Sequence, residues 1–108
     1  MRIEFSRSGG FVGRTIRTVI DTNHLPEEES RTVREELSSV DFFQLPDRIT
    51  SNQSGADQFV YQITVDDGER EHTVLISDAA APEALQPLLR RLTVLARSRP
   101  STQRRQDD

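Results

Sequence analysis

Residues 58–65 alternate between two kinds of side chain, and this pattern limits the fold more than any other feature of the chain. Every second side chain is bulky and apolar, and those between are mostly polar. A period of two places the two sets on opposite faces of a β-strand. Such a strand suits a sheet with one covered face and one face in water, so other segments must supply the cover. The apolar set is Phe59, Tyr61, Ile63 and Val65, and the other set is Gln58, Val60, Gln62 and Thr64.

Three further segments show this alternation, and two show the spacing of an amphipathic helix. Strands are expected over 2–6, 14–21 and 72–76, with turns over 8–13 and 66–69. The first helix is expected to open at Leu25-Pro26-Glu27 and to bury Val33, Leu37 and Val40; the second follows 77–82 and buries Leu85, Leu88, Leu89, Leu92 and Leu95. The order ββαββα predicts a two-layer α+β fold. A four-stranded, mainly antiparallel sheet would carry both helices on one face.

Two segments after the first helix complete this expectation. Phe42 and Phe43 follow the helix directly, and large aromatic side chains at such a position usually fill the core beneath it. Residues 47–56 show neither period, which predicts a polar loop.

Length and composition predict one domain and a tail. The chain has 108 residues, of which 33% are apolar, and a single core suits that size. Residues 97–108 contain no apolar side chain, so they cannot bury surface to offset the entropy of ordering. We therefore expect one domain over 1–96 and a disordered, charged tail over 97–108.

The residue types needed for catalysis or cofactor binding are sparse or badly spaced. The chain has no cysteine, and His24 and His72 lie far apart in unlike contexts. The glycines of 9–13 join two predicted strands, so they do not open a helix as a dinucleotide-binding loop does. Asp66 and Asp67 suit a hairpin turn better than a calcium loop. The sequence therefore predicts no catalytic residue, no cofactor and no metal, and a protein that binds or inhibits.

Charge and hydropathy limit the classes of partner that the protein is expected to bind and the cellular compartment in which it is expected to lie. The net charge is −4, and all 14 basic residues are arginine, whereas a protein built for nucleic acid is normally strongly basic. No apolar run reaches 18 residues, and the charged start Met1-Arg2-Ile3-Glu4-Phe5 is unlike a signal peptide. We expect a cytoplasmic monomer without a nucleic-acid or membrane partner.

Six segments, in order over roughly 1–95, together resemble the emfourin family. The resemblance implies a bacterial protein inhibitor whose partner is a protealysin, a thermolysin-like zinc metalloprotease. The segments are Arg7-Ser8-Gly9-Gly10-Phe11, Leu25-Pro26-Glu27-Glu28, Asp41-Phe42-Phe43-Gln44-Leu45-Pro46, Ala56-Asp57-Gln58-Phe59-Val60-Tyr61, His72-Thr73-Val74, and the run from Ser77-Asp78 through Ala81-Pro82 and Leu85 to Pro87-Leu88-Leu89.

Chain direction predicts where such an inhibitor would touch a protease. With antiparallel strands and short connections, the segments 8–13, 46–56 and 77–82 all fall at one end of the sheet. Loops on a rigid scaffold often carry recognition, so we expect these loops to block the active-site cleft. The predicted contact residues are Ser8, Gly9, Gly10, Phe11, Ser51, Asn52, Gln53 and Asp78.

Some of these side chains have a second interpretation. Thermolysin-like proteases favour a bulky apolar residue just after the cut bond, which Phe11, or less well Leu45, could mimic; Phe11 could equally fold back onto the core. Asp57 or Asp78 could approach the zinc ion, and each could equally cap a loop or a helix.

Two other classes of function compete with inhibition. An adaptor could recognise a partner through the exposed sheet face or the acidic helix. An accessory protein for nucleic acid could use the arginines near the C-terminus. These are Arg90, Arg91, Arg97, Arg99, Arg104 and Arg105.

Overall fold

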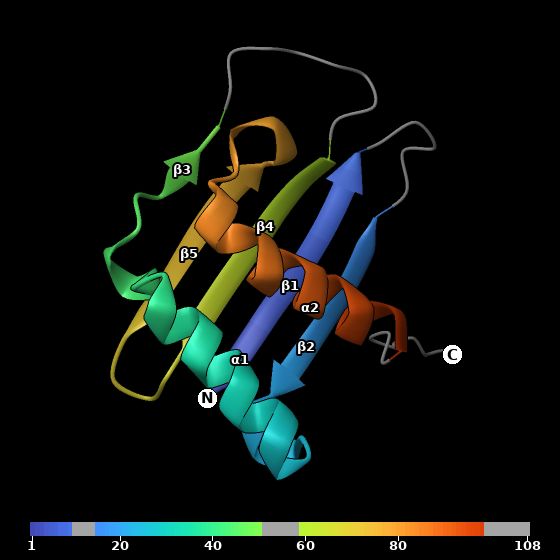
Figure 1. Cartoon of the computed structure of the whole chain (residues 1–108), viewed down its shortest axis with the longest axis vertical. Helices are drawn as coiled ribbons and strands as arrows, with labels where there is room; N and C mark the ends of the chain where they lie inside the picture. The colour runs from blue at the N-terminus through green and yellow to red at the C-terminus, as the bar shows by residue number, and fades with distance from the viewer. Residues whose placement is uncertain (10–14, 51–58, 99–108) are drawn as a thin grey trace.

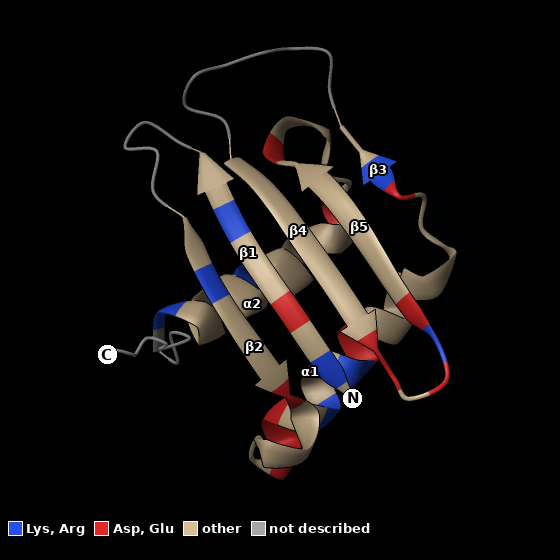
Figure 2. Cartoon of the chain, turned by 180° about the vertical axis from the view of Figure 1, so that it is seen from behind, with Lys and Arg blue, Asp and Glu red and all other residues tan. Residues whose placement is uncertain are grey.

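The computed structural model describes residues 1–9, 15–50 and 59–98 of the chain. In these parts, hydrogen bonds join five strands in the order β2-β1-β4-β5-β3. Helices α1 and α2 cover one face of this sheet (Figure 1), and the other face is open (Figure 2). The elements are β1 (Arg2–Gly9), β2 (Ile16–Asp21), α1 (Glu27–Ser39), β3 (Arg48–Ile49), β4 (Phe59–Asp66), β5 (Glu71–Ser77) and α2 (Gln86–Ser98).

Short 3-10 helices make the connections that the described residues include. They are η1 (Thr22–His24), η2 (Phe42–Gln44), η3 (Asp78–Ala80) and η4 (Glu83–Leu85). The turn between β4 and β5 is held by two aspartates, as expected for a hairpin. The Asp66 carboxylate accepts the Gly68 N–H at 2.8 Å, and the Asp67 carboxylate accepts the Arg70 N–H at 2.7 Å. Gly68 has a φ of 97°, which favours glycine at that position.

The α+β class, the mainly antiparallel sheet and the packing of both helices on one face are confirmed. The sheet has one more strand than expected, because β3 lies inside the segment predicted as a loop. β3 pairs with β5 in parallel, with Arg48 beside Leu75 and Ile49 beside Ile76. The Leu75 N–H also donates to the carbonyl of Asp47 at 2.8 Å. Two residues are too few to show any period, so this strand had no signal in the sequence.

The core lies between the helices and the covered face of the sheet. The alternating residues of the central strands supply one side, and Phe5, Ile63 and Val74 there are at most 1% exposed. The predicted apolar stripes supply the other side: Val33 and Leu37 of α1 are buried, as are all five leucines expected in or before α2. A side-chain hydrogen bond of 2.7 Å between Arg91 and Glu36 joins the two helices.

Phe42 fills the core at the end of α1, as predicted. It is 1% exposed, and its ring packs edge-on against the rings of Phe43 and His72, with centroids 5.9 and 5.7 Å away. Asp41 reverses the chain before it with a φ of 54°, a left-handed conformation that aspartate tolerates better than most residues. The same turn brings the Leu45 carbonyl to 2.7 Å from His72 Nε2. His72 thereby ties η2 to β5.

Helix α2 continues through Ser98, past the predicted start of the tail at residue 97, and the remainder of that tail lies outside the described residues. Of the helices in the described parts of the chain, none is long and apolar enough to cross a membrane.

Candidate functional site at the loop end of the sheet

The strand ends that adjoin the three predicted contact segments meet at one end of the sheet, here called the loop end. Gly9, the last residue of β1, pairs with Phe59, the first residue of β4. Val60 pairs with Ser77, the last residue of β5. β3 runs parallel to β5, so Ile49 reaches the same end beside Ile76. Figure 1 shows η3 at this end, beyond the tip of β5.

Three of the predicted contact residues can be placed at the loop end. Ser8 and Gly9 close β1, and Asp78 is the exposed first residue of η3. Gly9 has a φ of 93°, where a residue with a Cβ would be strained, so this exit from β1 requires glycine. Gly10, Phe11, Ser51, Asn52 and Gln53 lie outside the described residues, as does Asp57.

Leu45, suggested from the sequence as an alternative anchor for the protease, does not lie at the loop end. Its carbonyl oxygen contacts His72, the second residue of β5, whereas the loop end lies where β5 finishes. α1 crosses the strands and does not run the full length of the sheet (Figure 1). β3 then carries the chain along β5 to the loop end. Leu45 itself is half-buried against the core, so it cannot act as a protruding anchor there.

Three side chains on the covered face, those of Arg7, Phe59 and Tyr61, form a cluster next to the loop end. Arg7 pairs with Tyr61 across β1 and β4, and its guanidinium lies 4.3 Å from the centroid of the Phe59 ring. The Arg7 side chain also acts on the Tyr61 hydroxyl and lowers its pKa. The Tyr61 ring in turn packs against the Phe5 ring in the core, with 6.1 Å between the two ring centroids. Arg7 therefore joins the first residue of β4 to the core through two aromatic rings.

The charge of Asp78 also affects this cluster, through the pKa of Tyr61. Burial of the phenol raises the pKa of Tyr61, the negative charge of Asp78 raises it further, and Arg7 opposes both effects. The register of β4 against β5 explains this influence, because Val60 pairs with Ser77, the residue before Asp78. Asp78 is not the N-cap of η3, since Ser77 occupies that position.

Tyr61 is expected to titrate above the ordinary tyrosine pKa of about 10. The folded protein holds this proton more tightly than the unfolded chain, so its contribution to stability is complete below pH about 10. That contribution is lost as the pH rises through the folded-state pKa. Tyr61 is the only tyrosine and there is no tryptophan, so the change in near-ultraviolet absorbance when a phenol loses its proton reports this group alone. Asp78→Asn should lower the pKa; Asp67→Asn, at the opposite end of the sheet, should not. An equal response of both variants would contradict the cluster.

Arg7, Phe59 and Tyr61 were not among the predicted contact residues. A signal for Arg7 existed: it continues the alternation of Ile3 and Phe5, which puts a guanidinium on the apolar side of a strand. A charged group on that side needs partners. Nothing local shows that Tyr61 and Asp78 are near it, because those contacts arise from pairing with a distant strand.

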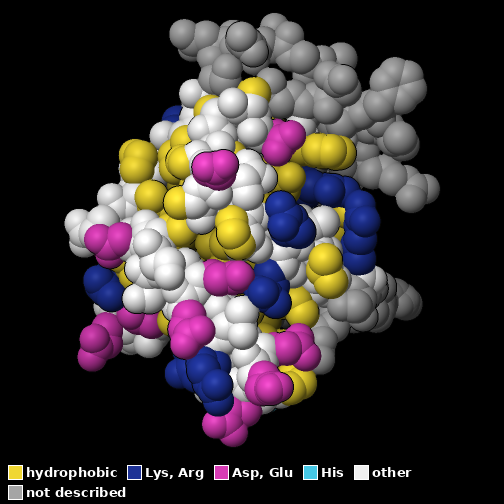
Figure 3. All heavy atoms as spheres, in the orientation of Figure 1, with side chains coloured by type: hydrophobic (Ala, Val, Ile, Leu, Met, Phe, Trp, Pro, Cys, Tyr) yellow, Lys and Arg dark blue, Asp and Glu magenta, His cyan; other side chains and the backbone are white. Residues whose placement is uncertain are grey.

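The opposite end of the sheet is acidic. Glu27, Glu28 and Glu29 open α1 there, beyond the end of β2, and Figure 2 shows acidic residues gathered at this end. In the space-filling view, acidic side chains cluster where α1 begins (Figure 3). This charge separation distinguishes the two ends of the molecule.

The arginines proposed for nucleic-acid binding are only partly described. Arg90 and Arg91 line a groove of about 330 Å³ between α1 and α2, with Glu29 and Glu36 on its other wall. Two carboxylates beside the two guanidiniums do not suit a phosphate backbone. Arg99, Arg104 and Arg105 lie outside the described residues.

Within residues 1–9, 15–50 and 59–98, no three histidine or acidic side chains gather in a way that could hold a metal ion. The Emfourin family model matches residues 5–93, which is most of the chain and includes the loop end. No curated protein and no solved structure matches.

Proposed function

The chain belongs to the emfourin family, and we propose that it inhibits a thermolysin-like zinc metalloprotease by placing the loop end of its sheet in the active-site cleft. Emfourins are protease inhibitors, which agrees with a role other than catalysis. The resemblance noted in the sequence points to a protease of the protealysin type. The observation that carries the proposal is the meeting of the ends of β1, β3 and β5 and the start of β4 at one place.

The anchoring of the loop end favours tight binding. Preorganised loops lose less conformational entropy on binding than loops that must become ordered. Ser8 and Gly9 are the last residues of an interior strand and pair with β4, and Arg7 contacts the start of β4 through Phe59 and Tyr61. We propose that Ser8, Gly9, Gly10, Phe11, Ser51, Asn52, Gln53 and Asp78 contact the protease.

Asp78 is the described acidic side chain best placed to approach the catalytic zinc. It is exposed at the loop end, and carboxylate oxygen is a common zinc ligand. Its electrostatic effect on Tyr61 supplies a second role in the free protein.

Titration of a protealysin-type protease with this protein tests the proposal. Peptide hydrolysis should fall as the inhibitor is added, and an unrelated zinc protease at the same concentration should be unaffected. Asp78→Ala should weaken inhibition; Glu28→Ala, at the acidic end, should leave it unchanged. Full protease activity with excess wild-type protein would refute the function. Equal inhibition by both variants would refute the role of Asp78 alone.

A further inference from the structure

The two edges of the sheet differ in how they are closed. At one edge, β3 and the segment before it cover β5: Asp47 accepts the Leu75 N–H, and Leu45 contacts His72. At the other edge, β2 has a neighbour on one side only. β2 contains no proline, one of the residues that often protect an edge strand.

The backbone groups on the outer side of β2 can be identified from one hydrogen bond. The Thr22 N–H donates to the Met1 carbonyl at 2.9 Å, so it points toward β1. Backbone groups alternate in direction along a strand, so those of Arg17, Val19 and Asp21 point away from β1. In the described parts of the chain, these outward N–H and C=O groups have no hydrogen-bond partner.

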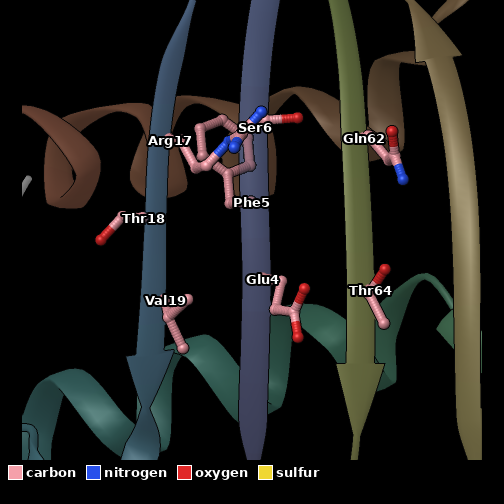
Figure 4. Close-up of a pocket in the computed structure, with 8 residues that line it drawn as sticks. All are labelled: Glu4, Phe5, Ser6, Arg17, Thr18, Val19, Gln62 and Thr64. Carbon is pink, nitrogen blue, oxygen red and sulfur yellow. The ribbon is translucent and has the colours of Figure 1, made fainter. Parts of the chain in front are cut away.

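The side chains of the same three residues stand on the open face of the sheet. Val19 is 47% exposed and Arg17 is exposed, and Figure 4 shows both on β2, with Val19 beside Glu4 of β1 and Arg17 beside Ser6. Asp21 follows two residues later on this face. A cation and an anion therefore flank an exposed apolar side chain at equal spacing.

We propose that β2 forms the interface of a homodimer, in which the β2 strand of a second copy adds antiparallel about a two-fold axis at Val19. Val19 then lies opposite Val19 of the second copy, and Arg17 lies opposite Asp21 in both directions. Each of these residue pairs exchanges two backbone hydrogen bonds, which satisfies every outward group named above.

Charge selects this register over its neighbours. A shift of one residue would place the outward N–H and C=O groups opposite residues whose backbone groups point toward β1, so no hydrogen-bonded ladder could form. A shift of two residues places either Arg17 or Asp21 opposite Val19 and loses both charge pairs. Only the register centred on Val19 puts opposite charges across from each other, which stabilises cross-strand pairs. The interface is therefore self-complementary, as a two-fold axis requires.

This arrangement changes the expectation of a monomer, which considered only the burial of one core. The two sheets become continuous, and the two loop ends point in opposite directions along the strands. One strand pair buries less surface than the interface of a tight dimer, so the association should be weak and reversible.

Sedimentation velocity over a range from about 10 μM to about 1 mM tests the proposal, since weak pairs associate in this range. The apparent mass should rise from 12.3 kDa toward twice that value with concentration. Arg17→Asp alone and Asp21→Arg alone should remain monomeric, because each places like charges opposite one another. An equimolar mixture of the two should associate. In a pair with one copy of each variant, the two substituted positions face each other with opposite charges, and the unchanged Arg17 faces the unchanged Asp21.

Two further variants separate this edge from the rest of the surface. Val19→Pro removes an outward N–H that bonds nothing within the monomer, so it should abolish association and leave the fold intact. Arg48→Asp, on the exposed side of the opposite edge strand, should not affect association. Asp21 also caps η1 by accepting the Asn23 N–H, so circular dichroism must show that Asp21→Arg is folded. A constant mass of 12.3 kDa up to about 1 mM, or a dimer that survives both Arg17→Asp and Val19→Pro, would overturn the proposal.

Discussion

Replacing Phe42 with alanine is expected to lower the free energy of unfolding by about 3–5 kcal/mol. The ring is 1% exposed and touches the rings of Phe43 and His72, so its removal leaves a cavity between α1 and β5. Urea denaturation followed by circular dichroism measures the loss, as a lower midpoint at an unchanged slope.

Phe43→Ala is the matched control for that experiment. Phe43 is only partly buried, and its ring lies 4.1 Å from the Arg70 guanidinium at the surface. Its truncation should cost clearly less than that of Phe42. Equal losses for the two variants would show that Phe42 does not close the core.

Phe11→Ala is expected to weaken inhibition about thirtyfold, which corresponds to about 2 kcal/mol of binding free energy. The expectation follows from the sequence, where Phe11 is the bulky apolar residue in a glycine-rich segment that leaves β1 at the loop end. The inhibition constant and the free energy of unfolding should be measured on the same variant. Loss of binding with little loss of stability supports an anchor in the protease cleft.

The converse result would assign Phe11 to the core. A phenylalanine folded onto the core would cost about 3–5 kcal/mol of stability when truncated. Unchanged inhibition together with that loss would leave Ser51, Asn52 and Gln53 as the next candidates. Phe43→Ala is again a suitable control, because η2 lies away from the loop end and inhibition should not change.

Periodicity predicted the elements that are long enough to repeat it. The four long strands and both helices have an apolar face, and burial of that face decides their structure. β3 has two residues and is stabilised by Leu75, far away in the chain, so no local pattern could reveal it. The place of Leu45 could not be predicted for the same reason: it depends on how far α1 reaches across the sheet.

The candidate site was predictable in outline only. Antiparallel direction brought Ser8, Gly9 and Asp78 to one end, because that result needs only the order of the elements. The support from Arg7, Tyr61 and Phe59 depends on the register of β1 against β4, and one residue of slip would reverse every side chain. Register is set by the whole core, so it is not encoded in either strand alone.

The strand order has a consequence for how the chain folds. β1, near the N-terminus, lies inside the sheet between β2 and β4, and pairs with β4 from Arg2 opposite Asp66 to Gly9 opposite Phe59. Pairing of β1 with β4 closes a loop that contains all the residues between these two strands. Closing this loop costs conformational entropy before the hydrogen bonds between the strands have formed, so this step should limit the folding rate. During synthesis, β1 and β2 must wait until β4 has left the ribosome. The surface assigned to protease binding therefore forms only when the sheet is complete, and an unfinished chain cannot inhibit.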